Sequence, residues 1–393
     1  MNLSKSVRVR TLTVGLDLAS DLADRTNFDH VERAISVLKR GQKAFAAAGH
    51  EVQTLRIATN PVLARQSASE RERSLGSLER LDALVTASGV MASIGPVIEA
   101  DRDDVEVASW AAELVRRTRS LSFSVVIASK DAGVHSHATL AAARVMAALS
   151  QAVPDGMGNF RFAAAANIPV GTPFFPVAWH AGAESVAIGV ESASVVEEVF
   201  AHAPRQRAGA ELVAVLNEVL MPIERIGAEW AAREQRVWRG IDTSPAPLQD
   251  RSIAAAIEAF TRMPFGSVST LEACSIITSA VKSLNVTRCG YCGLMLPVLE
   301  DPVLAQRAGE GRYRIRDLLL YSSVCGTGLD VVPIPGDTST ETLHGLLKDV
   351  AALSVRLNKP LSARLLLVPG KEAGELARFS DPLLTDCVVM KVD

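Results

Sequence analysis

Cysteines, aromatic residues and long apolar runs are all scarce in this chain of 393 residues. The cysteines number five, and such a small odd set does not indicate the disulfide framework of a small secreted protein. No apolar run approaches the length that spans a bilayer, and the opening residues MNLSKSVRVRTLTVGLDL lack the apolar core of a signal peptide. We therefore expect a reduced, cytoplasmic protein with no membrane partner.

An excess of charge of one sign is missing too. The formal net charge is −3 and no long basic run occurs, which argues against nucleic acid as a partner. No G-x-G-x-x-G motif follows a strand-like segment and no Walker phosphate loop is present, so we expect neither NAD nor ATP as a cofactor. A G-x-S-x-G motif is also absent, so a serine-hydrolase elbow lacks its usual signature.

What the sequence does contain is an alternation of two kinds of segment. Short apolar runs typical of strands alternate with longer segments in which apolar residues recur every three or four positions. This alternation predicts a largely parallel sheet with helical crossovers, and the abundant alanine suits close packing of its layers. The strand-like runs begin at Val7, Glu51, Leu121, Phe160, Ser185, Gly293, Leu329, Ala363 and Cys387.

The number of strand-like runs also bears on the architecture. It is large for a simple doubly wound sheet, so a closed or nearly closed α/β barrel, or two α/β halves side by side, fits better. Residues 209–284 read as almost wholly helical, without a convincing strand. We therefore expect one α/β barrel domain over residues 1–393, with a helical insertion at about 205–284.

Functional groups of α/β proteins gather where strands end and helices begin, and four such junctions carry reactive residues here. The first, SKDAGVHSHATL, holds His135 and His137 one residue apart. In an extended segment the two side chains share a face, a spacing that many metal sites use. The alternative is a polar loop that caps the following helix.

The second junction is the proline-rich segment NIPVGTPFFPVAWHAGAES, which begins at Asn167 and contains His180. Its prolines indicate a stiff loop, in which Phe174 and Phe175 either line a pocket or plug the end of the sheet. Glu191 closes the next strand-like run, where its carboxylate would lie at the carboxyl end of the strand.

The third junction, RCGYCGLMLPVLED, contains Cys289 and Cys292 as a C-x-x-C pair. A single pair is weak evidence for zinc, and it precedes a strand-like run instead of following one as a redox pair would. Ordinary, unligated thiols are the favoured interpretation.

The fourth junction is VCGTGLDVVPIPGDTS, which packs a cysteine, turn-forming residues and two acidic groups into one segment. Gly326 and Gly328 permit close backbone approach or a positive φ. Asp330 and Asp337 can act as acid/base groups or as ligands of a hard cation. The alternative for Asp337 is that it caps the next helix, but capping leaves Cys325 and Asp330 unexplained.

Longer motifs point to a family. The segments GRYRIRDLLLYSSVCGTGLDVVPIPGDTS, DGMGNFRFAAAANIPVGTPFFPVAWHAG and RLLLVPGKEAGE resemble the DUF711 (UPF0210) family, and the resemblance spans nearly the whole chain. It implies a fold similar to pyruvate formate-lyase, a ten-stranded α/β barrel of two parallel halves. Glycyl radical enzymes carry an Arg-Val-x-Gly loop, whereas this chain has a displaced Arg364 and a proline directly before Gly370. That departure argues against radical chemistry.

Together these residues predict an enzyme whose substrate is a small polar metabolite, acting by metal-assisted hydrolysis or lyase-type acid/base chemistry at the barrel mouth. A divalent metal ion held by His135, His137 and Asp330 is the candidate cofactor. The alternative is a non-catalytic protein that binds a small ligand and acts through subunit contacts, with a homodimer as the candidate assembly. The remaining candidates are the catalytic residues His180, Glu191, Asp337 and Cys325 and the ligand-binding residues Asn167, Gly326 and Gly328.

Overall fold

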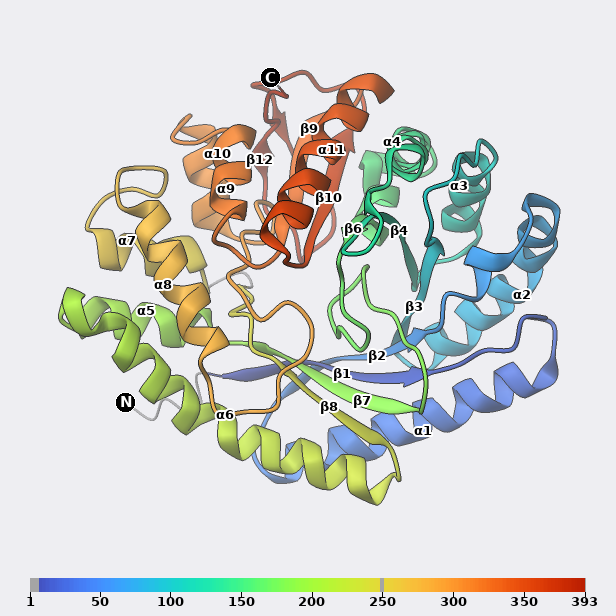
Figure 1. The fold of residues 1–393 in the computed structure, drawn as a ribbon, viewed down its shortest axis with the longest axis horizontal. Coiled ribbons are helices and arrows are strands. Elements are labelled where there is room, and N and C mark those ends of the chain that lie inside the picture. The colour runs from blue at the N-terminus through green and yellow to red at the C-terminus, as the bar shows by residue number, and fades with distance from the viewer. Residues whose placement is uncertain (1–6, 248–250, 393) are drawn as a thin grey trace.

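Ten strands form one curved sheet in the computed structural model, which describes residues 7–247 and 251–392 (Figure 1). The strand order is β8-β7-β1-β2-β3-β4-β6-β10-β9, and β5 pairs with β4 beside this path. The central strands run parallel to one another, whereas the pair at each edge runs antiparallel to its central neighbour. The strands are β1 (Arg8–Leu16), β2 (Val52–Thr59), β3 (Val90–Ile98), β4 (Leu121–Ser129), β5 (Gly133–Val134), β6 (Phe162–Ala166), β7 (Ser185–Glu191), β8 (Val237–Asp242), β9 (Gly328–Pro335) and β10 (Leu361–Val368), with β11 (Leu376–Ala377) and β12 (Cys387–Val388) as a separate pair.

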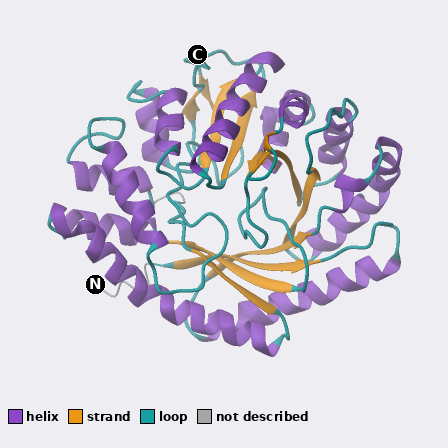
Figure 2. Cartoon of the chain, viewed as in Figure 1, coloured by secondary structure: helices purple, strands orange, loops and turns teal. Residues whose placement is uncertain are grey.

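Helices cover the convex face of the sheet, and long loops occupy its concave side (Figure 2). The structure also contains short 3₁₀ segments at Val62–Arg65, Pro154–Arg161 and Arg205–Arg207. The helices are α1 (Arg25–Ala47), α2 (Ala68–Ala87), α3 (Val107–Arg117), α4 (Ser136–Ser150), α5 (Ala193–His202), α6 (Ala208–Arg233), α7 (Ile253–Thr261), α8 (Thr270–Lys282), α9 (Pro302–Gly309), α10 (Ile315–Ser322) and α11 (Thr340–Leu357).

Capping residues in the sequence set several helix boundaries. The α2 helix begins with a capping box, in which Ser67 accepts from the backbone N–H of Glu70 and Glu70 accepts from the backbone of Ser67. The α11 helix begins after Ser339, whose hydroxyl accepts from the Thr342 N–H, and ends at Asn358 in the left-handed region with φ 48°. The helix expected after GDTS is therefore confirmed, and its cap is Ser339.

The apolar core lies between the sheet and its helices, but the amino ends of the central strands are polar on one face. Beyond its first residues β1 is fully buried, and β6 reads FAAAA with every side chain buried. Arg8 and Arg10 of β1, and Thr54 and Arg56 of β2, stand two residues apart and line the concave side. Because side chains two positions apart in a strand share a face, these polar groups converge on one region.

The α/β class and the mostly parallel sheet are confirmed, but no closed barrel is formed by residues 7–247 and 251–392. The edge strands β8 and β9 do not pair with each other. The segment between α8 and α9 passes between them, and within the described residues it makes two isolated bridges, Ile241 with Arg288 and Pro297 with Asp330. The predicted strand GLMLPV lies in this segment and is irregular, because Gly290 and Cys292 have positive φ and turn the backbone.

Apart from the two-residue strands β5 and β11, two strands of the described chain were not predicted, β3 and β8. In β3, Gly95 has a positive φ and stands next to Pro96, so the sequence reads as a turn, and the pairing with β4 shifts register there. The strand β8 lies inside the region expected to be a helical insertion, which is therefore not wholly helical. Its Gly240 has φ 114°, and a Cβ at that position would lie 2.3 Å from the Thr287 carbonyl oxygen.

Among the described residues, none of the helices combines the length and apolar character that a membrane-spanning segment requires.

Candidate functional site

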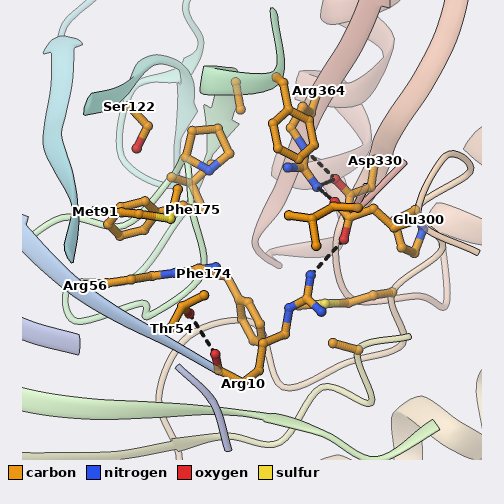
Figure 3. Close-up of a pocket in the computed structure, with 18 of the residues that line it drawn as sticks. Arg10, Thr54, Arg56, Met91, Ser122, Phe174, Phe175, Glu300, Asp330 and Arg364 are labelled. Atoms are coloured by element: carbon orange, nitrogen blue, oxygen red, sulfur yellow. Dashed lines mark hydrogen bonds and ion pairs between the residues drawn. The ribbon is translucent and has the colours of Figure 1, made fainter. Parts of the chain in front are cut away.

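A cavity of about 530 Å³ lies on the concave side of the sheet (Figure 3). Its floor is made by the amino ends of the central strands β1, β2, β3, β4 and β6, and β9 and β10 form one wall. Two loops complete the lining, residues 174–177 and residues 291–300, and the second of them lies beside β9. Its volume falls in the range of sites for small molecules.

Two arginines and two carboxylates form a connected cluster in this cavity (Figure 3). Glu300 lies between Arg10 and Arg364, with its Oε2 2.8 Å from Arg10 Nη2 and its Oε1 2.8 Å from Arg364 Nη2. Arg364 also donates through Nε to Asp330 Oδ1 at 2.9 Å. The four side chains are between 6% and 15% exposed, so each charge depends on its partners for stabilisation.

Local backbone features orient this cluster. The register between β9 and β10 shifts between Ala363 and Leu365, and Val331 beside it has φ 46°. Such a bulge re-aims side chains, here Asp330 and Arg364 toward the cavity. Glu300 is held by its neighbour Asp301, whose carboxylate caps α9 and accepts from the first backbone N–H groups of α7.

The pKa values of the two carboxyl groups are shifted in opposite directions. Burial raises the pKa of Asp330, and repulsion from Glu300 adds to this effect against the attraction of Arg364. Burial also opposes ionisation of Glu300, but Arg364 and Arg10 together outweigh it and lower the Glu300 pKa. Glu300 has two guanidinium partners whereas Asp330 shares one of them, which explains the difference.

Arg56 extends into the same cavity from β2 (Figure 3). Its guanidinium carbon lies 4.8 Å from the centroid of the Phe175 ring, and the residue is 8% exposed. Within residues 7–247 and 251–392, its Nε and Nη1 atoms have no hydrogen-bond partner. Burial, followed by repulsion from Arg10, lowers the pKa of Arg56 to about 9, which leaves the side chain charged at neutral pH.

The predicted histidine pair does not share a face. His135 is buried, with Nε2 3.0 Å from Ser129 Oγ and Nδ1 3.3 Å from the Val126 carbonyl oxygen. His137 is exposed in the first turn of α4, and its backbone N–H donates to Asp101 at 2.6 Å. In the part of the chain that the structure describes, no three His, Cys, Asp or Glu side chains are grouped so that they could hold a metal ion. His135, His137 and Asp330 are thus not brought together.

The residues predicted in the second junction hold the backbone around them. His180 is fully buried, with Nε2 3.0 Å from the Gly182 carbonyl oxygen and Nδ1 3.2 Å from Ser185 Oγ. Asn167 has φ 54° and donates through Nδ2 to Ser354 Oγ at 2.9 Å. Phe174 and Phe175 of the same loop do line the cavity.

Glu191 lies behind the cavity wall and does not line it. Its Oε2 accepts a hydrogen bond from Gln53, which is itself a wall residue. Burial raises the pKa of Glu191, and its Oε1 has no hydrogen-bond partner in the described part of the chain.

In the fourth junction, Asp330 lines the cavity and the other predicted residues do not, whereas Thr327, which was not predicted, also lines it. Asp337 is exposed in the turn before α11. The Cys325 side chain is fully buried, and its carbonyl oxygen accepts from Lys359 Nζ.

The two predicted glycines of this junction serve packing. A Cβ on Gly326 would lie 2.4 Å from the Gly293 Cα, and a Cβ on Gly328 would lie 2.3 Å from the Ser362 carbonyl oxygen. The turn residues of VCGTGLDVVPIPGDTS thus allow close approach of neighbouring chain segments.

Four residues of the cavity were not predicted as site residues, namely Arg10, Arg56, Glu300 and Arg364. The predicted residues stand where strands end, whereas this cavity lies at the amino ends of the central strands. The sequence does contain a pattern that points to these arginines, because each stands among apolar residues in a strand-like run. These runs are VRVRTLTV, QTLRIAT and ARLLLV. In a strand buried on both faces such a charge has to be paired or serve a site.

A second cavity, of about 870 Å³, lies near the carboxyl ends of β1, β2 and β3. Its lining includes Asp17, Arg65, Glu99 and Trp179. Burial raises the pKa of Glu99, with Arg65 opposing the shift. Asp17 is 54% exposed, so this region is less enclosed than the arginine-lined cavity.

Comparison with known proteins identifies relatives along the whole chain. A family model described as "Uncharacterised ACR (DUF711)" matches residues 1–380. A UPF0210 protein of Pyrobaculum aerophilum is 31% identical over 353 residues, which cover 85% of this chain and 77% of the relative. A UPF0210 protein of Acetivibrio thermocellus is 27% identical over 417 aligned positions, covering 99% of this chain and 91% of the relative.

Proposed function

The chain belongs to the DUF711 (UPF0210) family, and we propose that it is an enzyme that carries out acid/base chemistry on a small polar metabolite in the arginine-lined cavity. In this proposal Asp330 exchanges a proton with the substrate. Glu300 stays ionised and holds Arg10 and Arg364 in place.

The observation that carries the proposal is the opposite shift of two carboxyl groups that share one arginine. Asp330 has a raised pKa and Glu300 a lowered one, although both bind Arg364. Two carboxyl groups whose environments push their pKa values apart are typical of an acid/base pair. Asp330 Oδ1 is occupied by Arg364, and Oδ2 makes no hydrogen bond within the described residues, which leaves it for a ligand.

We favour lyase-type proton transfer over the metal-assisted hydrolysis that the sequence suggested. The supporting groups are carboxylates paired with arginines, and the described residues offer no group of three side chains that could ligate a metal ion. A cation bound with the substrate is compatible with this proposal, but none of its steps requires one.

The relation to pyruvate formate-lyase is likewise a proposal. The five central strands run in one direction, and the strand pairs at both edges run in the opposite direction. This arrangement supports a sheet built of two halves with opposite strand directions. Radical chemistry is not supported, because no cysteine is found among the described residues that line the cavity. Gly370 lies in a turn after β10 and is exposed.

The test is proton exchange on a panel of small acids in D₂O, followed by nuclear magnetic resonance. We expect the wild-type protein to exchange or eliminate a substrate proton, and Asp330→Asn to lose this activity while it stays folded. The matched control is Asp337→Asn, which changes an exposed aspartate of the same segment and should leave activity unchanged. Wild-type activity in Asp330→Asn contradicts the proposal. A ligand that binds without being consumed favours the non-catalytic alternative.

A further inference from the structure

We propose that Arg56 is an anion subsite and that the metabolite bound in the cavity is a small carboxylate or phosphate ester with an apolar part. This inference rests on the proposed function and names the class of substrate. The shared chemistry is an oxyanion that a guanidinium can bind through two parallel hydrogen bonds.

The charges of the cavity leave Arg56 without a counterion. Arg10 and Arg364 are matched by Glu300 and Asp330 at 2.8 to 2.9 Å. No ion pair of Arg56 occurs in the part of the chain that the structure describes. A buried charge normally has a partner, because its desolvation is otherwise uncompensated. An anionic ligand would supply that partner.

Other arginines of the lining do not take over this role. Arg161 donates to the backbone carbonyl oxygens of Leu121 at 2.6 Å and Thr118 at 2.6 Å, so its guanidinium supports the chain. Arg119 is exposed. Arg8 pairs with Glu51 at 3.3 Å. The cations near the opening favour the approach of an anion, and Arg56 is positioned to hold it inside.

The geometry of Arg56 suits recognition of an oxyanion. Its guanidinium carbon lies 4.8 Å from the Phe175 centroid, a contact that restrains the group while its end points toward the middle of the cavity (Figure 3). A guanidinium fixed in this way loses little freedom on binding. Figure 3 also shows that Arg56 points toward the side of the cavity that holds Glu300 and Asp330, so a bound anion would bring its apolar part near the proposed acid/base group.

The rest of the lining defines the other parts of the ligand. Thr327 Oγ1 is buried and has no hydrogen-bond partner among residues 7–247 and 251–392, so it can serve a polar group of the ligand. Apolar and aromatic side chains make up much of the wall and suit a short apolar body, namely Met91, Ala163, Phe174, Phe175, Val177 and Met295.

The test uses benzoate and phenyl phosphate as probes, with benzamide as the uncharged analogue, in isothermal titration calorimetry. We expect benzoate, phenyl phosphate or both to bind the wild-type protein and benzamide not to bind. Arg56→Gln should weaken anion binding by roughly ten- to hundredfold, since it removes a charged hydrogen-bonding group. The ratio of the two affinities separates a carboxylate site from a phosphate site.

A matched control is available on the protein surface. Arg80 stacks on Phe28 at 4.5 Å in the same way as Arg56 on Phe175, but it is exposed on α2 and outside the cavity. Arg80→Gln should therefore bind the probes as the wild type does. Because Arg56 is buried and unpaired, both Arg56→Gln and Arg56→Met should fold and melt at or above the wild-type temperature without ligand.

Two results overturn the inference: anion binding that is unchanged in both Arg56 variants, or no binding of either probe to the wild-type protein at millimolar concentration. The proposed function fails separately. If the anions bind through Arg56 but Asp330→Asn does not alter proton exchange, the anion subsite is supported and the acid/base role of Asp330 is wrong. If Asp330→Asn abolishes exchange while Arg56→Gln binds normally, the subsite alone is wrong.

Discussion

Replacing Glu300 by glutamine tests whether this carboxylate holds the arginine cluster together. In the structure Glu300 accepts one hydrogen bond from Arg10 and one from Arg364, both at 2.8 Å, and it is 6% exposed. Glutamine keeps the size and one oxygen acceptor, but it presents an NH₂ group to the second arginine. One of the two charged hydrogen bonds is lost and the guanidinium that made it stays buried.

The magnitude follows from these contacts. Breaking a buried ion pair by removing one partner costs about 3–5 kcal/mol, and the retained acceptor places Glu300→Gln near the low end, at about 3 kcal/mol of unfolding free energy. If the glutamine oxygen stays with Arg364, the remaining side-chain hydrogen bond of Arg10 in the described chain is the 3.4 Å contact with the Pro247 carbonyl oxygen. The double variant Arg10→Gln with Glu300→Gln should thus lose less unfolding free energy than the sum of the losses in the two single variants. The difference, which is the coupling energy of the two residues, should be about 1–3 kcal/mol.

The pH dependence has a defined sign. The pKa of Glu300 is lowered from its ordinary value of 4.5, so the group stabilises the fold above that pH and its contribution is lost as the pH falls through the lowered value. The difference in unfolding free energy between the wild type and Glu300→Gln should therefore reach its maximum by pH 7 and decrease in strong acid.

The assay is urea unfolding followed by far-ultraviolet circular dichroism at several pH values. The control is Glu113→Gln, which removes a partly exposed carboxylate paired with two exposed arginines, Arg116 and Arg117, and should change the unfolding free energy by less than about 1 kcal/mol. If Glu300→Gln unfolds at pH 7 within about 0.5 kcal/mol of the wild type, the reasoning about this cluster is refuted.

Two further predictions concern packing and metal. Gly326→Ala should destabilise the fold by about 1–3 kcal/mol, because its Cβ would lie 2.4 Å from the Gly293 Cα, whereas Gly345→Ala in α11 meets nothing within 4 Å and should be neutral or stabilising by up to about 1 kcal/mol. Urea midpoints that move in the same direction for both glycines would contradict this packing argument. His135→Ala and His137→Ala should keep the metal content of the wild type in elemental analysis, because the two side chains point to different environments. A metal content lowered by either histidine change would restore the predicted site.

Apolar patterning is sufficient to predict most of the sheet, but it misses the central strand β3 and the edge strand β8. Runs such as LSFSVVIAS and SVAIGVE are strands because they are apolar and rich in β-branched residues, and the structure confirms them as β4 and β7. GLMLPV is similarly apolar but has one β-branched residue, and it does not pair as a strand. Its path is set by the Asp242 carboxylate, which accepts the backbone N–H groups of Tyr291 and Cys292 from 49 and 50 residues away.

The same argument explains why only part of the site was predictable. Asp330 was found because it stands in an unusual local segment. Its partners stand in ordinary strands or in a loop, and Arg10 and Glu300 are separated by 290 residues. No local pattern encodes such a pairing, since it depends on the register and curvature of the whole sheet.

Arg364 connects the predicted resemblance to the observed site. In the predicted resemblance Arg364 departs from the Arg-Val-x-Gly pattern of glycyl radical enzymes, because six positions separate it from Gly370. In the structure it faces the cavity, binds both carboxylates and lies 4.9 Å from the Phe160 ring. An arginine at this place in β10 stabilises negative charge on Glu300 and limits the rise of the Asp330 pKa. Arg364 thus places one cation between two carboxyl groups, and in the proposed function this sharing leaves Asp330 to exchange a proton while Glu300 stays ionised.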